Sequence, residues 1–128
     1  MYIEKEGDLL LKAFDKGMDR HLKYTSRYIK SLCKNLTDKN EEKVRNRIES
    51  RILACCTTID SEYRMIMRDI SGMSYDLWYR DKYFKSLILS IDYYLEMTAR
   101  EYLTIDKKVL ERITRLKNKI HSQIYFKD

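Results

Sequence analysis

Apolar side chains recur every three or four positions along four long stretches of the chain, and short polar gaps separate these stretches. This spacing is typical of helices that bury one face against a neighbour. The pattern predicts helices over residues 8–34, 38–70, 75–102 and 104–124. The second helix begins at a capping box of Asp38 and Glu41, Gly72 ends it, and Ser74 caps the third.

The two strongest helix breakers are scarce, since the chain has no proline and three glycines among 128 residues. Most of the chain can therefore be helical. Because the polar gaps are short, successive helices are expected to lie antiparallel as neighbours. We predict an all-α fold, an up-down-up-down four-helix bundle with long helices, in a single domain over residues 1–128.

The chain is basic, with a formal net charge of +6 and a pI of about 9.2. The predicted helix order brings the basic segment 20–51 and the start of the last helix to one end of the bundle. Two stripes with 4-3-4 spacing form cationic ridges there, and an anionic partner would relieve their mutual repulsion. The alternative is a solvated face that also carries Glu41, Glu42 and Glu49. The residues expected to hold nucleic-acid phosphates are Lys23, Arg27, Lys30, Lys34, Arg45, Arg47, Arg51, Lys108, Arg112, Arg115 and Lys119.

Motifs for metal or cofactor chemistry are missing from the sequence. There is no H-E-x-x-H, no glycine-rich phosphate loop and no set of carboxylates at core positions, so we expect no metal and no cofactor. Cys33, Cys55 and Cys56 form no C-x-x-C pair, and we interpret them as buried apolar residues in a reducing compartment. No apolar run is long enough for a membrane span, and the N-terminus is not a secretory signal, so we expect a cytoplasmic protein.

The segment from Arg115 to His121 resembles the signature of HEPN ribonucleases, in which an arginine shortly precedes a histidine. The resemblance implies a small, dimeric ribonuclease that works without a metal. In such an enzyme Arg115 would stabilise a phosphorane and His121 would transfer a proton. The polar residue that usually follows the family's arginine is not in that place here, since Asn118 lies further along.

A longer stretch, Arg80 to Leu95 followed by Tyr102 to Ile124, resembles the accessory protein (Avd) of diversity-generating retroelements and the related four-helix-bundle proteins of 23S ribosomal RNA intervening sequences. The shared features are an arginine-led third helix, a short turn and a last helix of similar length. The family's Gly-Arg and Gly-Gly-Trp motifs are replaced here by Lys119 to Ile124. The resemblance implies a non-enzymatic basic bundle that binds a reverse transcriptase and its RNA template. We therefore expect a homo-oligomer that binds RNA rather than DNA.

A third interpretation is a protein–protein adaptor of phage or cellular origin. Eleven tyrosines are many for this length, and several fall outside the predicted seams. Such tyrosines either rim a helical core with the hydroxyl in water or anchor a partner. An exposed cluster of them on the third helix would favour an oligomer or a partner surface.

Overall fold

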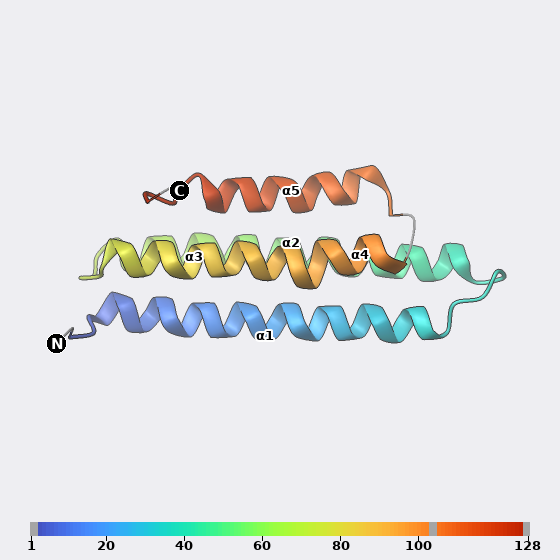
Figure 1. The fold of residues 1–128 in the computed structure, drawn as a ribbon, viewed down its shortest axis with the longest axis horizontal. Helices are drawn as coiled ribbons and strands as arrows, with labels where there is room; N and C mark the ends of the chain where they lie inside the picture. The colour runs from blue at the N-terminus through green and yellow to red at the C-terminus, as the bar shows by residue number, and fades with distance from the viewer. Residues whose placement is uncertain (1–2, 103–104, 127–128) are drawn as a thin grey trace.

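The computed structural model describes residues 3–102 and 105–126, and this part of the chain consists of helices and their short connections. The helices are α1 (Glu6–Lys34), α2 (Glu41–Ile70), α3 (Leu77–Ile91), the π-helical turn η1 (Asp92–Glu96), α4 (Met97–Tyr102) and α5 (Lys107–His121). Because α3, η1 and α4 follow one another without a gap, they form one rod, and the described part of the chain folds into four helices, of which α5 is the shortest (Figure 1). The all-helical, four-helix prediction is confirmed.

The rods lie along a common axis, and α1 runs in the same direction as the α3–η1–α4 rod (Figure 1). The main contacts join α1 with α2, α2 with α5, α5 with α3, and α3 with α1. The α3 rod therefore packs beside α1. The expectation that every helix lies beside the one before it is met by α1 and α2 but not by α2 and α3.

The position of α3 is explained by the connection 71–76, which lies against the first turn of α1. The Gly7 amide donates a hydrogen bond to the Ser74 carbonyl oxygen at 2.9 Å. The buried Asp8 carboxylate accepts a hydrogen bond from the Asp76 amide at 2.7 Å. Since Gly7 has no side chain, the connection can approach the α1 backbone closely and deliver α3 next to α1.

The starts of α2 and α3 differ from the sequence-based expectation. The residue at the start of α2 is Asn40 rather than Asp38. The cap of α3 is Asp76 rather than Ser74, because the Asp76 side chain accepts a hydrogen bond from the Trp78 amide at 2.9 Å. The backbone of Ser74 is engaged with α1 instead, which moves the helix start along the chain.

The last helix is shorter than predicted. Asp106 caps α5 by accepting a hydrogen bond from the Lys108 amide at 2.8 Å, and the helix ends at His121. Ile124 was predicted as part of the helical seam, but it reaches the core from a non-helical segment, where it is buried. Thr104, expected at the start of this helix, lies outside the described residues.

The π turn η1 was not predicted, and polar contacts on both sides hold it. Lys117 of α5 donates to the Asp92 carboxylate at 2.6 Å and to the Glu96 carboxylate at 3.2 Å. The hydrogen bond from Lys117 is the main reason why the pKa of Asp92 lies below its ordinary value. Next to the turn, the hydroxyl groups of Ser26 and Thr98 share a buried hydrogen bond of 3.1 Å. These contacts tie the rod to α5 and to α1.

One continuous core runs between the rods, built from the apolar seams that the sequence pattern predicts. At its centre the rings of Phe14 and Tyr63 pack edge-on against Phe84. Cys55 and Cys56 are buried in this core, and burial raises the pKa of Cys56 to about 12. Among the described residues, no helix combines the length and the apolar character needed to cross a membrane.

Candidate nucleic-acid interface

A basic groove lies between α1 and α2, near the end of the molecule where these helices are connected. Its volume is about 510 Å³. Lys43, Arg47 and Arg51 line it together with Asn46 and with Tyr28 of α1, and no carboxylate is part of its lining. Positive charge that no nearby acid opposes attracts phosphate groups, because the phosphates replace the missing counter-charge.

Helical spacing brings the three cations together. Lys43, Arg47 and Arg51 follow one another at intervals of four residues and so share one face of α2. The guanidinium carbon of Arg51 lies 4.2 Å from the centre of the Tyr28 ring. This cation–π contact orients the guanidinium, and it leaves the nitrogen donors able to bind a phosphate.

His21 lies close enough to Arg51 for the charge of Arg51 to affect its pKa. Burial, and secondarily the positive charge of Arg51, lower the pKa of His21. The imidazole is therefore neutral at pH 7. Its buried Nε2 atom has no hydrogen-bond partner within the described part of the chain. The groove therefore owes its positive charge to the lysine and arginine side chains.

Most cations of the predicted stripe on α1 are exposed to solvent. Arg27, Lys30 and Lys34 are exposed, and they line a shallow hollow of about 430 Å³ on the surface of α1. Lys23 is different, since its ammonium group lies 2.9 Å from the Asp19 carboxylate. The hydrogen bond to Asp19 is the main reason why the pKa of Lys23 is raised.

The predicted stripe on α5 is partly neutralised by an acid from α2. The Asp60 carboxylate lies 2.6 Å from the Lys119 ammonium group and 3.6 Å from a guanidinium nitrogen of Arg112. Lys108 and Arg115 are exposed and form no ion pair among residues 3–102 and 105–126. Two of the four cations, Arg112 and Lys119, therefore join α5 to α2.

The structure divides the predicted cations among separate surfaces. Since α1 packs with α2 and α3 while α5 packs with the same two helices, α1 and α5 lie diagonally across the molecule. The α1 and α5 stripes thus face different sides. Arg45 lies on the α5 side of α2, about 4.0 Å from Glu49. Lys43 was missing from the predicted contact residues, although its spacing of four from Arg47 marks the same face.

The ion pairs of Asp60 affect how stability depends on pH. Burial by itself raises the pKa of Asp60, but the hydrogen bond from Lys119 and the charges of Lys119, Arg64 and Arg112 outweigh it, so the pKa lies below its ordinary value of 3.8. A carboxyl group whose pKa is lowered by folding stabilises the folded state at pH values above its ordinary pKa. That stabilisation is lost as the pH falls through the lower, folded-state value.

We expect Asp60→Asn to lower the melting temperature at pH 7 and to cost progressively less as the pH falls below 3.8. Thermal unfolding of both proteins across this range measures the difference. Asp69→Asn, at an exposed position on the same helix, is the control. A cost that stays constant into strong acid would show that the ion pairs contribute nothing to stability.

The alternative catalytic pair does not converge within one chain. Arg115 and His121 are both exposed on α5. Six residues of α-helix place them about 120° apart around the helix axis. A site built from both would need a second chain. Within the described residues, no three His, Cys, Asp or Glu side chains gather as metal ligands would.

Comparisons with protein-family models, with curated proteins and with solved structures found no match in any of the three. The groove between α1 and α2 combines three cations with an arginine that stacks on a tyrosine ring.

Proposed function

We propose that this chain is a non-enzymatic, basic helical-bundle accessory protein of up-down-up-down topology that binds RNA on its α1–α2 side. The observation that carries this proposal is the groove in which Arg51 stacks on Tyr28 beside Lys43 and Arg47, with no acid in the lining. The resemblance to retroelement accessory proteins suggests that the RNA is held for a polymerase such as a reverse transcriptase.

Single-stranded RNA fits the chemistry of this side of the molecule. Tyr24, one turn before Tyr28 on α1, is exposed and offers a ring on which a base can stack. Arg47 and Arg51 bind phosphate oxygens with paired donors. The outward stripe of α1 continues the positive surface toward the end of that helix. Stacking and phosphate contacts of this kind are tolerant of sequence, so we expect affinity with little preference among RNA sequences.

The decisive experiment compares two double variants of the same helix. Arg47→Gln with Arg51→Gln removes two groove cations, and Arg64→Gln with Arg68→Gln removes two exposed cations at the other end of α2. Both lower the net charge equally and keep the same spacing. Binding of a fluorescent single-stranded RNA is measured by anisotropy over a series of salt concentrations.

We expect the groove variant to bind RNA about tenfold more weakly. The slope of log K against log salt should become less steep by about 1.4, since each phosphate contact on a single strand contributes about 0.7. The control variant should retain nearly the affinity and slope of the unchanged protein. Equal losses in the two variants would mean that overall charge, and not this groove, attracts the RNA.

A further inference from the structure

A second basic hollow lies between α4 and α5, and it contains the two cations of the α5 stripe that Asp60 does not neutralise. Its volume is about 710 Å³. The residues that line it are Arg100, Lys107, Lys108, Leu110, Glu111, Thr114 and Arg115. Outside its own rod, α4 packs mainly against α1 rather than α5, which leaves space between α4 and α5. Four cations and one acid share this space.

Two of these cations have no counter-charge. Lys108 and Arg115 are exposed and form no ion pair among residues 3–102 and 105–126. They lie seven residues apart, which is two helical turns and about 10 Å along α5. Both side chains therefore lie on one face of the helix and can contact different phosphates of one strand. The guanidinium group of Arg115 offers paired donors that match the oxygens of a phosphate.

The other two cations have only distant counter-charges. Lys107 lies 3.9 Å from Glu111, and both side chains are largely exposed. Arg100 lies 3.9 Å from Glu96, whose carboxylate also accepts a hydrogen bond of 3.2 Å from Lys117. Both 3.9 Å separations exceed the roughly 2.7–2.9 Å of a hydrogen-bonded ion pair. A phosphate in the hollow can therefore bind Lys107 and Arg100 as well.

This hollow lies on the opposite edge of the bundle from the α1–α2 groove. Around the bundle the rods follow one another in the order α1, α2, α5 and the α3–η1–α4 rod, which packs against α1 again. The α1–α2 edge and the α4–α5 edge therefore face opposite sides. Both clusters of cations lie toward the end of the molecule where α1 and α2 are connected (Figure 1).

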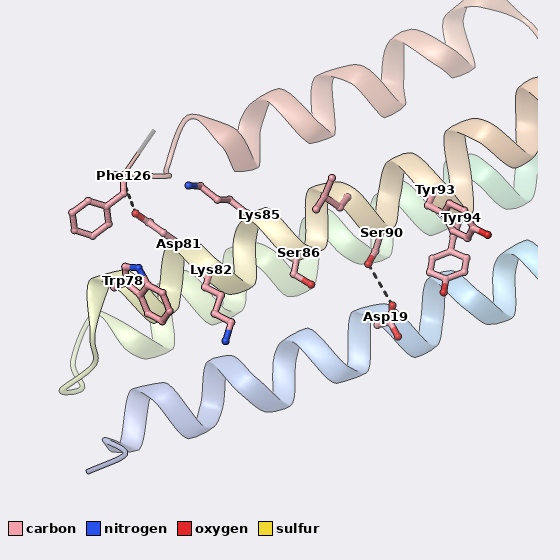
Figure 2. Close-up of a pocket in the computed structure, with 11 residues that line it drawn as sticks. Asp19, Trp78, Asp81, Lys82, Lys85, Ser86, Ser90, Tyr93, Tyr94 and Phe126 are labelled. Carbon is pink, nitrogen blue, oxygen red and sulfur yellow. Dashed lines mark hydrogen bonds between the residues drawn. The ribbon is translucent and has the colours of Figure 1, made fainter. Parts of the chain in front are cut away.

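Other parts of the surface carry no excess of positive charge. On the α2–α5 edge, the Asp60 carboxylate neutralises two cations of α5. Figure 2 shows a further hollow, of about 550 Å³, along the α3 rod. The charged residues that line it are two bases and two acids, Lys82, Lys85, Asp19 and Asp81. The cations between α4 and α5 are therefore a local cluster and not part of a uniformly basic surface.

The lining between α4 and α5 favours phosphates over an acidic protein. Among the described residues, Leu110 is the one apolar side chain of the lining, and it is half-buried. Protein interfaces place aromatic and apolar anchors at their centre, whereas counterion release on phosphate binding needs cations alone. The described lining also contains no aromatic ring on which a base could stack. This site should therefore bind RNA more weakly than the α1–α2 groove does.

We propose that the α4–α5 hollow is a second RNA-binding site, so that one chain holds two RNA segments at once, on opposite sides of the bundle. The inference rests on the proposed function for the first of these two sites. Two helices, each about 10 Å across, separate the sites, so the segments are held roughly 20 Å apart. Holding two strands on one protein raises their effective concentration for each other. The activity that this arrangement predicts is strand bridging.

Counting the RNAs bound per chain tests the second site. Equilibrium dialysis with a labelled RNA of about six nucleotides, the size of one single-strand site, measures this ratio at saturation. The unchanged protein should bind two RNAs per chain, and Lys108→Glu with Arg115→Glu should bind one. The control is Arg64→Glu with Arg68→Glu, which makes the same charge change at exposed positions of α2 and should still bind two. One RNA per unchanged chain, or two in the α5 variant, would overturn the proposal.

A variant of the α1–α2 groove distinguishes this inference from the proposed function. Arg47→Glu with Arg51→Glu should also leave one RNA per chain, bound at the weaker site. The two double variants combined should leave none. If the groove variant still bound two RNAs while the α5 variant bound one, the α1–α2 groove would not be an RNA site and the α4–α5 site would remain supported.

Energy transfer between a donor-labelled and an acceptor-labelled RNA tests strand bridging. The two RNAs are not complementary, so they approach each other only on the protein. The unchanged protein should produce transfer, and the α5 variant should lose it while it still binds one RNA. Transfer that persists in the α5 variant would mean that bridging arises between copies of the chain, which contradicts two sites on one bundle. An oligoglutamate that displaced the second RNA as well as unlabelled RNA does would assign the hollow to an acidic protein and would also contradict the proposal.

Discussion

Replacing Gly7 with alanine is expected to lower the free energy of unfolding by about 3 kcal/mol. An added Cβ would lie 2.7 Å from the Tyr75 Cβ and 2.8 Å from the Ser74 carbonyl oxygen. Both neighbours belong to the connection that fixes α3 beside α1, and the second is backbone. The connection must therefore move away, which lengthens the hydrogen bond from the Gly7 amide to the Ser74 carbonyl. Urea unfolding followed by circular dichroism measures the loss.

Gly17→Ala is the matched control on the same helix. An added Cβ at Gly17 meets nothing within 4 Å. Alanine is the better helix former by about 0.5–1 kcal/mol, so this variant should be more stable than the unchanged protein. A loss of stability in Gly7→Ala together with a gain in Gly17→Ala would indicate that the connection approaches the α1 backbone closely at Gly7. If both variants gained stability, the connection 71–76 could not lie against α1 as described.

The helices could be predicted from the sequence because their apolar residues repeat with the helical period. The seam from Leu11 to Ile29 and the seam from Val109 to Ile120 are buried as expected. The order of the rods could not be predicted in this way. It depends on Gly7 and Asp8 meeting residues almost 70 positions later in the chain, and neither contact leaves a periodic signal.

The candidate site could be predicted only in part, because a pattern within one helix is visible in the sequence and a contact between helices is not. Stripes such as Arg27, Lys30 and Lys34 are visible in the sequence because they share one helix. Whether a stripe remains charged depends on neighbouring helices. Asp60 of α2 neutralises Arg112 and Lys119, and it lies more than 50 residues from either of them. The groove, in contrast, could have been found from the i, i+4 spacing of Lys43 and Arg47.

The loss of Asp81 is expected to release the segment that follows α5 from the α3 rod. Asp81 is 2% exposed, and its Oδ2 atom accepts hydrogen bonds from the Tyr125 amide at 3.0 Å and the Phe126 amide at 2.7 Å. Arg80 supports the same segment by donating to the Gln123 carbonyl oxygen at 2.8 Å. Hydrogen bonds to a charged acceptor contribute about 1.5–3 kcal/mol each. We therefore expect Asp81→Ala to cost about 3 kcal/mol in urea unfolding.

Hydrogen exchange locates this effect, because the Tyr125 and Phe126 amides should lose their protection before the core of α3 does. Asp81→Asn removes the negative charge but keeps the size of the side chain, so it distinguishes the contribution of the charge from that of packing. The amide keeps one oxygen acceptor but brings an NH2 group toward the Arg80 guanidinium, so its cost should lie between that of Asp81→Ala and zero. Asp69→Ala removes an exposed carboxylate from α2 and should change little. Unchanged exchange at residues 125 and 126 in the Asp81→Ala protein would mean that the apolar contacts of Ile124, rather than the buried carboxylate, hold this segment on α3.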